Sequence, residues 1–304
     1  MRFAFSTFNH CLQGKIIVED ITVTMGSQIA ALGHKVTWTE DADFIPREEG
    51  WNVVLECFAD DATIVGIPIV ETLAKAHAAG CRFLCVATEE PGEVGFNSAL
   101  DPGMILRQNA FPAAAQYLDG ILHLVPGDNV TRWYSNFAPS AYAELGFAPA
   151  MVEESREEPH IDFGFYGLMT WRRREIIDEI AKRSGKPVLE MTSLLTPRAQ
   201  RNDEMRRARV ILQIRANLET QWVSSTRCAS ALHMGRPIVA EPHQIRGPWD
   251  EIVPFADTIE DFYVQAIATA ANWRGAWRGQ VDRFAAKLSP GTCVGRPLKE
   301  IGAI

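Results

Sequence analysis

The feature that most constrains this chain is a regular alternation of short apolar segments and amphipathic segments between His160 and Pro242. Residues 226–239, TRCASALHMGRPIV, lie at its centre and predict a helix that leads directly into a β-branched strand. Gly235 stands where a helix C-terminus favours positive φ, and Pro237 cannot continue a helix. This stretch therefore predicts a sharp helix-to-strand transition.

More units of the same kind surround it. The predicted strands are 162–167, 187–195, 210–214, 236–241 and 251–255, and the predicted helices are 170–184, 197–208, 257–273 and 277–288. The central helix is predicted to begin near residues 219–221, which places Arg227 about two turns inside it. Such alternation indicates a parallel sheet with helical crossovers, in which ligands bind at the carboxyl ends of the strands.

The first half repeats the pattern. Its predicted strands are 2–7, 34–38, 52–58, 82–87 and 121–125, and its predicted helices are 19–32, 67–79, 104–118 and 128–134. Residues 82–87 are nearly all apolar, which favours a central strand. Residues 138–159 are punctuated by proline and become acidic, which is typical of an interdomain linker. We therefore expect two domains with a boundary near residue 155.

Length and composition exclude several classes of protein. A chain of 304 residues exceeds the usual size of one domain. Its net charge of −8 argues against a general nucleic-acid or anionic-membrane surface. No apolar run reaches the roughly 18 residues of a membrane span, and the first residues lack a signal-peptide cleavage region. The six cysteines form no CxxC pair. A soluble cytoplasmic protein with reduced thiols is the expectation.

Several motifs resemble glycosyltransferases with two Rossmann-like domains, the GT-B architecture. They are FGFYG (163–167) with WRRREII (171–177), ARVILQIRANLETQWVSSTRCASALHMGRPIVAEP (208–242), QIAALGHKVTW (28–38) and YAELGFAPAM (142–151). The third of these resembles the opening helix and strand of that fold, and the fourth resembles the passage toward its linker. The closest resemblance is to bacterial group-one-like and spore-coat-maturation-type transferases.

This resemblance implies an α/β fold in which two parallel sheets face a central cleft. It implies an acceptor-side domain at 1–155, a nucleotide-sugar-binding domain at 156–275, and a helical segment at 276–304 that returns to the first domain. The implied activity is transfer of a sugar from a nucleotide-diphosphate sugar to a hydroxyl acceptor, with no nucleic acid as partner.

The family motif, roughly Arg-x-x-Glu-Ala-x-Ala-x-Gly-x-Pro-Val-Val, is only partly matched. The matching positions are Arg227, Ser230, Ala231, Gly235, Pro237 and Val239. Retaining members carry two glutamates eight positions apart, and here Trp222 and Ser230 occupy those positions. The stereochemistry of transfer therefore stays open.

The donor-binding candidates are mainly residues that can hold a diphosphate. Guanidinium groups suit phosphate oxygens, and a helix N-terminus adds a positive dipole end. The candidates are Gly14, Gly167, Arg172, Arg201, Arg215, Glu219, Thr226, Arg227, Ser230 and His243. Gly14 belongs to the loop 8–15, which is either a phosphate cradle or a plain structural turn.

The candidates for the catalytic base lie in the first half. His10 follows the first predicted strand, and Glu89 and Glu90 follow the fourth. Each is placed at a strand end where a base would be useful, although two solvated glutamates are the simpler interpretation of the latter pair. No DxD pair stands near a strand end, so we expect no essential metal and no cofactor.

Two other functions fit the same fold. A nucleotide-sugar epimerase would convert the donor without an acceptor. A non-catalytic protein would bind the nucleotide or the sugar and turn nothing over, which Ser230 and Trp222 make credible. Fold by itself does not separate these three.

Overall fold

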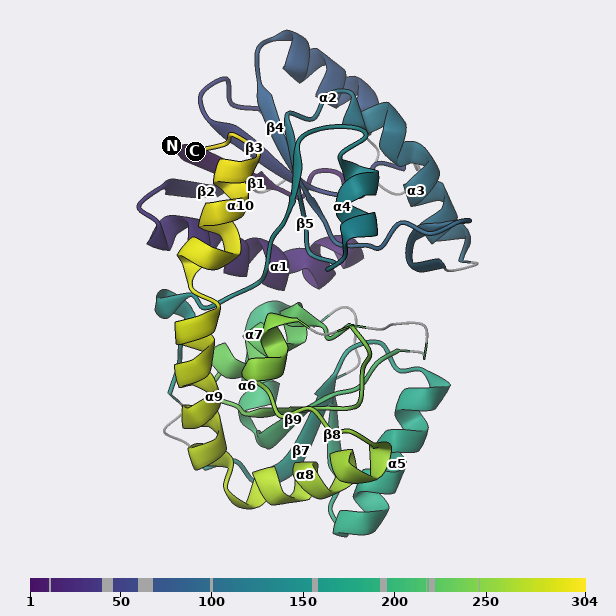
Figure 1. Ribbon diagram of the computed structural model, residues 1–304, viewed down its shortest axis with the longest axis vertical. Helices are drawn as coiled ribbons and strands as arrows, with labels where there is room; N and C mark the ends of the chain where they lie inside the picture. The colour runs from purple at the N-terminus through teal and green to yellow at the C-terminus, as the bar shows by residue number, and fades with distance from the viewer. Residues whose placement is uncertain are drawn as a thin grey trace. The chain divides into compact units, whose positions relative to one another are not determined.

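The computed structural model describes residues 1–10, 12–39, 46–59, 68–98, 101–154, 158–191, 196–216, 218, 222–245 and 247–304. The chain divides into two compact units (Figure 1). Unit 1 comprises Met1–Lys15, Met25–Glu144 and Pro290–Ile304. Unit 2 comprises Ile16–Thr24 and Leu145–Ser289. Each unit is therefore built from segments that are separated in the sequence.

Unit 1 contains a six-stranded sheet in which every neighbouring pair is parallel. The strand order is β2-β1-β3-β4-β5-β6. The strands are β1 (Arg2–Ser6), β2 (Lys35–Thr39), β3 (Trp51–Leu55), β4 (Arg82–Ala87), β5 (Gly120–His123) and β6 (Ser140–Tyr142). The prediction that 82–87 forms a central strand is confirmed, because β4 lies between β3 and β5.

The helices of unit 1 come partly between these strands and partly from the C-terminal segment. They are α1 (Leu12–Ala31), α2 (Ile69–Ala78), the 3₁₀ helix η2 (Phe96–Ser98), α3 (Pro102–Ala115), α4 (Asp128–Tyr134), the π-helix η5 (Gly291–Gly295) and α10 (Arg296–Glu300). The C-terminal segment packs on the sheet of unit 1, where Ala303 accepts a hydrogen bond from Trp51 Nε1 at 3.1 Å.

Unit 2 contains a four-stranded parallel sheet in the order β10-β9-β7-β8. Its strands are β7 (Ile161–Tyr166), β8 (Val188–Met191), β9 (Ala208–Gln213) and β10 (Ile238–Ala240). Its helices are η3 (Pro149–Met151), α5 (Trp171–Ser184), α6 (Arg198–Arg206), α7 (Ser225–His233), η4 (Pro248–Glu251), α8 (Ile259–Ala271) and α9 (Trp273–Lys287).

The core of unit 2 follows the two-residue period of its strands. Phe163 and Phe165 of β7 pack with Val210 and Leu212 of β9 in one buried cluster. Isoleucines of α5 and aromatic residues of α8 complete this cluster, so these two helices cover the same face of the sheet (Figure 1). The carboxyl ends of the strands are left to the connecting loops.

The α/β class with two parallel sheets is confirmed, while the cleft between them stays a prediction. Several local predictions were wrong, and three of them lie after residue 137. The linker 138–159 contains the short strand β6, residues 251–255 form no strand beyond a single bridge from Phe255 to Ala240, and α7 begins at Ser225.

The start of α7 has a clear physical reason. Ser224 adopts an extended conformation, and its hydroxyl accepts a hydrogen bond from the Arg227 N–H at 3.5 Å. Serine is a favoured N-cap because this bond satisfies one of the free N–H groups of the first turn. Arg227 therefore lies in the first turn of α7, and not two turns inside it.

Among the described residues, no helix has the length and apolar character needed to cross a membrane.

The indole hydrogen bond of Trp51 offers a test of how the C-terminal segment is held. Trp51→Phe removes the donor to the buried Ala303 carbonyl, and we expect a loss of about 1–2 kcal/mol in the free energy of unfolding. Urea unfolding measures this change. The control is Trp38→Phe, at a half-exposed position where a ring can still stack on Phe5, and it should change stability by less. Equal losses in both variants would contradict this view of Trp51.

Candidate functional site

The carboxyl ends of β7 and β9 meet around Gly167, the residue that follows β7. Its φ is +133°, a conformation that other residues rarely adopt. A β-carbon placed on Gly167 would lie 2.8 Å from Arg227 Nη2 and 3.8 Å from Arg173 Nη1. Glycine therefore leaves room for two guanidinium groups beside the backbone.

Arg227 is fixed by both strands. Its Nε donates to the Tyr166 carbonyl at 2.8 Å, and its Nη1 donates to Gln213 Oε1. The guanidinium also lies over the rings of Phe165 and Tyr166, 5.3 and 5.4 Å from their centroids. The side chain is 6% exposed, so its orientation is determined by the fold.

Arg173 reaches the same place from α5. Its Nε donates to the Ile214 carbonyl at 3.0 Å, and its Nη1 donates to the Leu168 carbonyl at 2.6 Å. Thr170 caps α5 by accepting from the Arg173 N–H at 3.3 Å. The cap sets where α5 begins and thereby directs Arg173 toward the strand ends.

Arg172 and Arg215 lie around one carboxylate, that of Glu241, which follows β10. Arg172 donates through both terminal nitrogens to Glu241, with Nη1 to Oε1 at 2.9 Å. The Arg215 backbone N–H also donates to Glu241, and Arg215 Nε lies 3.6 Å from Oε1. Glu241 is 2% exposed and orders both arginines.

Positive charge is therefore in excess here. Among the described residues, Arg172, Arg173, Arg215 and Arg227 gather with one carboxylate, Glu241. Burial lowers the pKa of Arg227, and burial together with the neighbouring Arg227 lowers the pKa of Arg173 to about 9. Both shifts mean that the charged guanidinium is destabilised in this place, which a bound anion would relieve.

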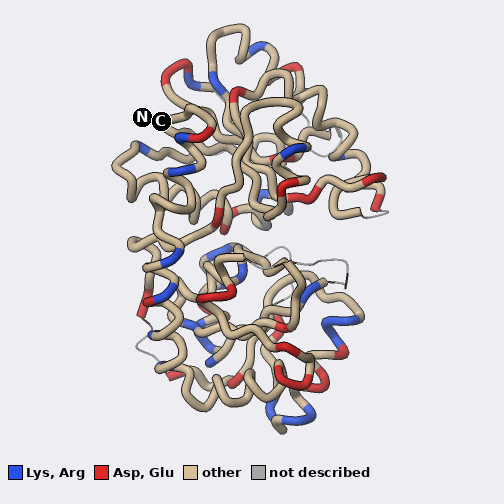
Figure 2. Tube along the Cα trace, viewed as in Figure 1, with Lys and Arg blue, Asp and Glu red and all other residues tan. Residues whose placement is uncertain are grey.

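The arrangement suits a phosphate ester. Guanidinium groups form paired hydrogen bonds with phosphate oxygens, and the N-terminus of the fourteen-residue α5 adds its positive dipole end. We call the group formed by Gly167, Arg172, Arg173, Arg215 and Arg227 the arginine site. Figure 2 shows that Lys and Arg are otherwise interspersed with Asp and Glu along both units.

The other predicted donor residues of unit 2 fall into three positions. Thr226 and Ser230 lie beside Tyr166, whose hydroxyl donates to the Thr226 carbonyl at 3.3 Å and interacts with the Ser230 side chain. Arg201 donates to Asp20 Oδ2 at 2.6 Å. His243 is paired with Asp250 at 3.0 Å and packs on Phe255.

The remaining donor candidates are Gly14 and Glu219. Gly14 lies inside α1 beside the His10 ring, and not in the loop that the sequence suggested, because the helix begins at Leu12. Glu219 lies outside the described residues. The structure thus brings together Gly167, Arg172, Arg215 and Arg227 from the predicted set.

The predicted base candidates lie at the carboxyl ends of the strands in unit 1. His10 follows β1, and its Nδ1 is 3.1 Å from Asn9 Oδ1. Asn9 Nδ2 donates to the carbonyls of Leu55 and Cys57, which orients its amide oxygen toward the His10 ring.

Glu89 and Glu90 follow β4. Glu89 pairs with Arg107 Nη1 at 3.1 Å, and the pKa of Glu90 is raised by burial. Both therefore belong to the folded loop, in contrast to the simpler expectation of two solvated glutamates.

Sequence reasoning missed several residues of these two sites. Arg173 was not separated from its neighbours, and Gln213, Glu241, Glu56 and Arg107 were not singled out. Glu56 and Glu241 share a signal that could have identified them: each is a lone carboxylate that directly follows a run of apolar residues, 53–55 and 238–240, and the structure ends a strand at each of these runs. Nothing in the local sequence marks Arg107.

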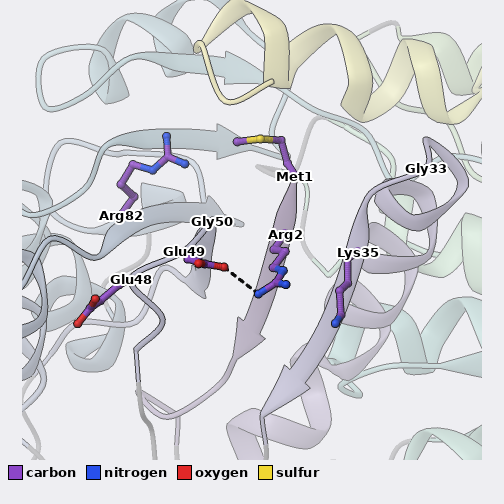
Figure 3. A pocket seen from close by; sticks show the side chains of 8 residues that line it. All are labelled: Met1, Arg2, Gly33, Lys35, Glu48, Glu49, Gly50 and Arg82. Atoms are coloured by element: carbon purple, nitrogen blue, oxygen red, sulfur yellow. Dashed lines mark hydrogen bonds and ion pairs between the residues drawn. The ribbon is translucent and has the colours of Figure 1, made fainter.

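A hollow of about 700 Å³ lies elsewhere, at the amino ends of the strands of unit 1 (Figure 3). It is lined by Met1, Arg2, Gly33, Lys35, Glu48, Glu49, Gly50 and Arg82. Its Arg2 is paired with Glu49 at 2.9 Å, and both side chains are exposed. Parallel sheets bind ligands at the opposite, carboxyl end, so this hollow is not the candidate site.

Within the described ranges, no three His, Cys, Asp or Glu side chains gather in a way that could hold a metal ion. Whether the protein needs a metal stays a prediction.

Comparison with known proteins found similar solved structures at low sequence identity. No family model and no curated protein matches it. Among solved structures it is similar to TarM, at 9% identity with a TM-score of 0.49, over 84% of this chain and 55% of that one. It is also similar to the glycotransferase of kitacinnamycin, at 12% identity with a TM-score of 0.41, over 99% of both chains.

A third similar structure is Arabidopsis thaliana UGT89C1 complexed with UDP-L-rhamnose, at 8% identity with a TM-score of 0.39, over 99% of this chain and 98% of that one. Likenesses this distant decide neither the family nor the activity, so the functional argument depends on the geometry of the chain itself.

The arginine site makes a direct prediction for Gly167→Ala. The new β-carbon would displace Arg227, so we expect affinity for inorganic pyrophosphate to fall by about tenfold or more. Isothermal titration calorimetry measures it. The matched control is Gly185→Ala, which also has positive φ, +66°, but has nothing within 4 Å of the added carbon. If both variants bind pyrophosphate like the unmodified protein, the arginine site does not bind it.

Proposed function

We propose that this chain is a GT-B-type glycosyltransferase, which moves a sugar from a nucleotide-diphosphate sugar to a hydroxyl acceptor without a metal ion. The observation that carries the proposal is the arginine site, where guanidinium groups outnumber carboxylates at the carboxyl ends of parallel strands. The motif resemblance between residues 163 and 242 supports the same assignment.

The geometry fits the demands of this reaction. When the bond between the sugar and the diphosphate breaks, negative charge grows on the leaving phosphate oxygen. Guanidinium groups that are already oriented stabilise that charge without first having to reorganise. Arg227 and Arg173 are held by strand-end carbonyls, so their remaining N–H donors keep fixed directions.

The ligand specificity can be established by thermal stabilisation. A panel of nucleoside diphosphates and their sugars should raise the unfolding temperature for the matching base, because a ligand that binds only the native state stabilises it. Transfer is then followed with and without an acceptor. Donor conversion without an acceptor would point to an epimerase, and binding without any turnover would point to a non-catalytic protein.

The role of Arg227 is tested by Arg227→Lys, which keeps the charge but loses the planar fork. We expect nucleoside diphosphate affinity to fall by roughly ten- to a hundredfold, as for the loss of one charge-assisted hydrogen bond. Calorimetry measures the affinity, and Arg278→Lys, at an exposed position on α9, is the control. Should Arg227→Lys unfold, Arg173→Lys tests the same site. Unchanged affinity in a folded variant would remove that arginine from the site.

The metal-free reaction makes a separate prediction. Because guanidinium groups take the role that a divalent cation has in metal-dependent transferases, we expect turnover to persist in excess EDTA. A radiolabelled-sugar transfer assay checks this. Loss of activity that manganese restores would show that the reaction needs a metal.

A further inference from the structure

A second charged group is buried at the carboxyl ends of β3 and β4 in unit 1. Arg107 of α3 donates through Nη2 to Glu56 Oε1 at 2.7 Å and lies with Nη1 3.1 Å from Glu89 Oε1. It also donates to the Glu56 carbonyl at 2.9 Å. One guanidinium group therefore bridges two carboxylates, which follow neighbouring strands. We call Glu56 and Glu89 the carboxylate pair and Arg107 its bridge.

The bridge leaves the two carboxylates in different environments. The Glu56 side chain is 1% exposed, and its Oε2 accepts from the Thr88 N–H at 3.3 Å. The Glu89 side chain is 19% exposed. Only Glu89 can therefore meet a molecule that arrives from solvent, while Glu56 acts from behind it through Arg107.

Glu89 is held in place by a strained residue. Asn97 Nδ2 donates to Glu89 Oε2 at 2.6 Å, although Asn97 has a φ of +59° that side-chain-bearing residues seldom adopt. The amide of Asn97 cannot turn over freely, because its Oδ1 accepts from the Glu90 N–H at 2.9 Å. The Tyr134 hydroxyl fixes the Glu89 backbone by donating to its carbonyl at 2.9 Å. Strain of this kind is often kept where it positions a functional group.

The charges do not balance. Burial raises the pKa of Glu56 to about 7, Arg107 opposes this rise, and the second carboxylate, Glu89, adds to it. The other titratable groups facing Glu56 are Cys85 of β4 and Tyr134 of α4, and burial raises the pKa of both, so they are neutral near pH 7. Glu56 therefore changes its charge near neutral pH, beside a guanidinium group that also faces Glu89.

We propose that Glu89 is the base that takes the acceptor's proton, and that Glu56 and Arg107 are positioning residues that hold and pair its carboxylate. This rests on the proposed glycosyl transfer. The acceptor O–H bond breaks as a Glu89 O–H bond forms, and the oxygen electron pair attacks the sugar carbon. The bond from that carbon to the diphosphate breaks, and its electron pair leaves with the diphosphate.

Glu56 acts through the shared guanidinium group. While Glu56 is neutral, Arg107 is the charge partner of Glu89 alone and pairs tightly with its carboxylate. Once Glu56 ionises, Arg107 is divided between two carboxylates, so the Glu89 carboxylate is less tightly paired and freer to meet the acceptor's O–H. The rate of transfer should therefore increase as the pH rises through about 7, where Glu56 loses its proton.

The test is the pH profile of kcat/KM in Glu56→Gln, which keeps a neutral side chain of the same shape. In the unmodified protein we expect kcat/KM to rise about tenfold between acid and alkaline pH, with its midpoint near pH 7. In Glu56→Gln we expect kcat/KM to stay at the value that the unmodified protein has at acid pH. Glu144→Gln is the control, since Glu144 is a buried carboxyl of unit 1 outside this group. A step that persists in Glu56→Gln would overturn the role of Glu56.

Glu89→Gln tests the base itself. We expect transfer to fall by about a hundredfold or more while the affinity of the arginine site for nucleoside diphosphate stays unchanged. Transfer that survives Glu89→Gln but is lost in His10→Gln would assign the base to His10 and overturn the proposal.

A second measurement separates this inference from the proposed function. Infrared difference spectra between pH 6 and pH 8 should show the carbonyl band of a protonated carboxyl disappearing in the unmodified protein and in Glu144→Gln. Glu56→Gln, which lacks this carboxyl, should show no such change. This readout needs no substrate. If no donor supports transfer and the band is present, the glycosyltransferase assignment fails while the change of charge at Glu56 stands; if the band is missing, the change of charge at Glu56 fails.

Discussion

Crowding of like charges at the carboxyl ends of β7 and β9 is the constraint on which much of unit 2 depends. Arg227 and Arg173 approach the same glycine, and each is held by carbonyls at the strand ends. Such a group is tolerated because part of its N–H donors have fixed acceptors and its planes lie over aromatic rings, which explains the buried Gln213 and the rings of Phe165 and Tyr166 beside Arg227. The glycine, the cap of α5 and the cap of α7 all serve this one arrangement.

Unit 1 shows the opposite imbalance. There a single guanidinium group lies between two carboxylates, so acidic groups outnumber the basic one. Under the proposed function, the two imbalances match two separate demands, since glycosyl transfer releases an anion and removes a proton. Each demand is argued from its own unit. A pair of carboxylates that share a guanidinium group differs from an isolated base, because how tightly the exposed carboxylate is paired depends on the charge of a residue that does not meet the substrate.

The sequence predicted what depends on local pattern. Strands β4 and β7, helix α4 and the parallel character of both sheets followed from apolar runs and from glycine and serine or threonine positions. The failures have physical reasons. Three residues are too few to show a strand pattern, so β6 was interpreted as linker, and the cap at Ser224 was overlooked. Partners distant in sequence could not be foreseen: Arg107 and Glu56 are 51 positions apart, and Arg172 and Glu241 are 69 apart.

The discontinuity of unit 2 limits how such chains can be recombined. Its nine-residue piece from α1 carries Asp20, which pairs with both Arg198 and Arg201. A graft of residues 145–289 onto a foreign first half would abandon that carboxylate and leave two guanidinium groups uncompensated, a defect of about 3–5 kcal/mol. Exchange of residues 145–289 between related proteins would thus lower stability unless α1 were exchanged with them. Unit 2 is therefore exchanged intact only together with its piece of α1, and a change at Asp20 requires matching changes at Arg198 and Arg201.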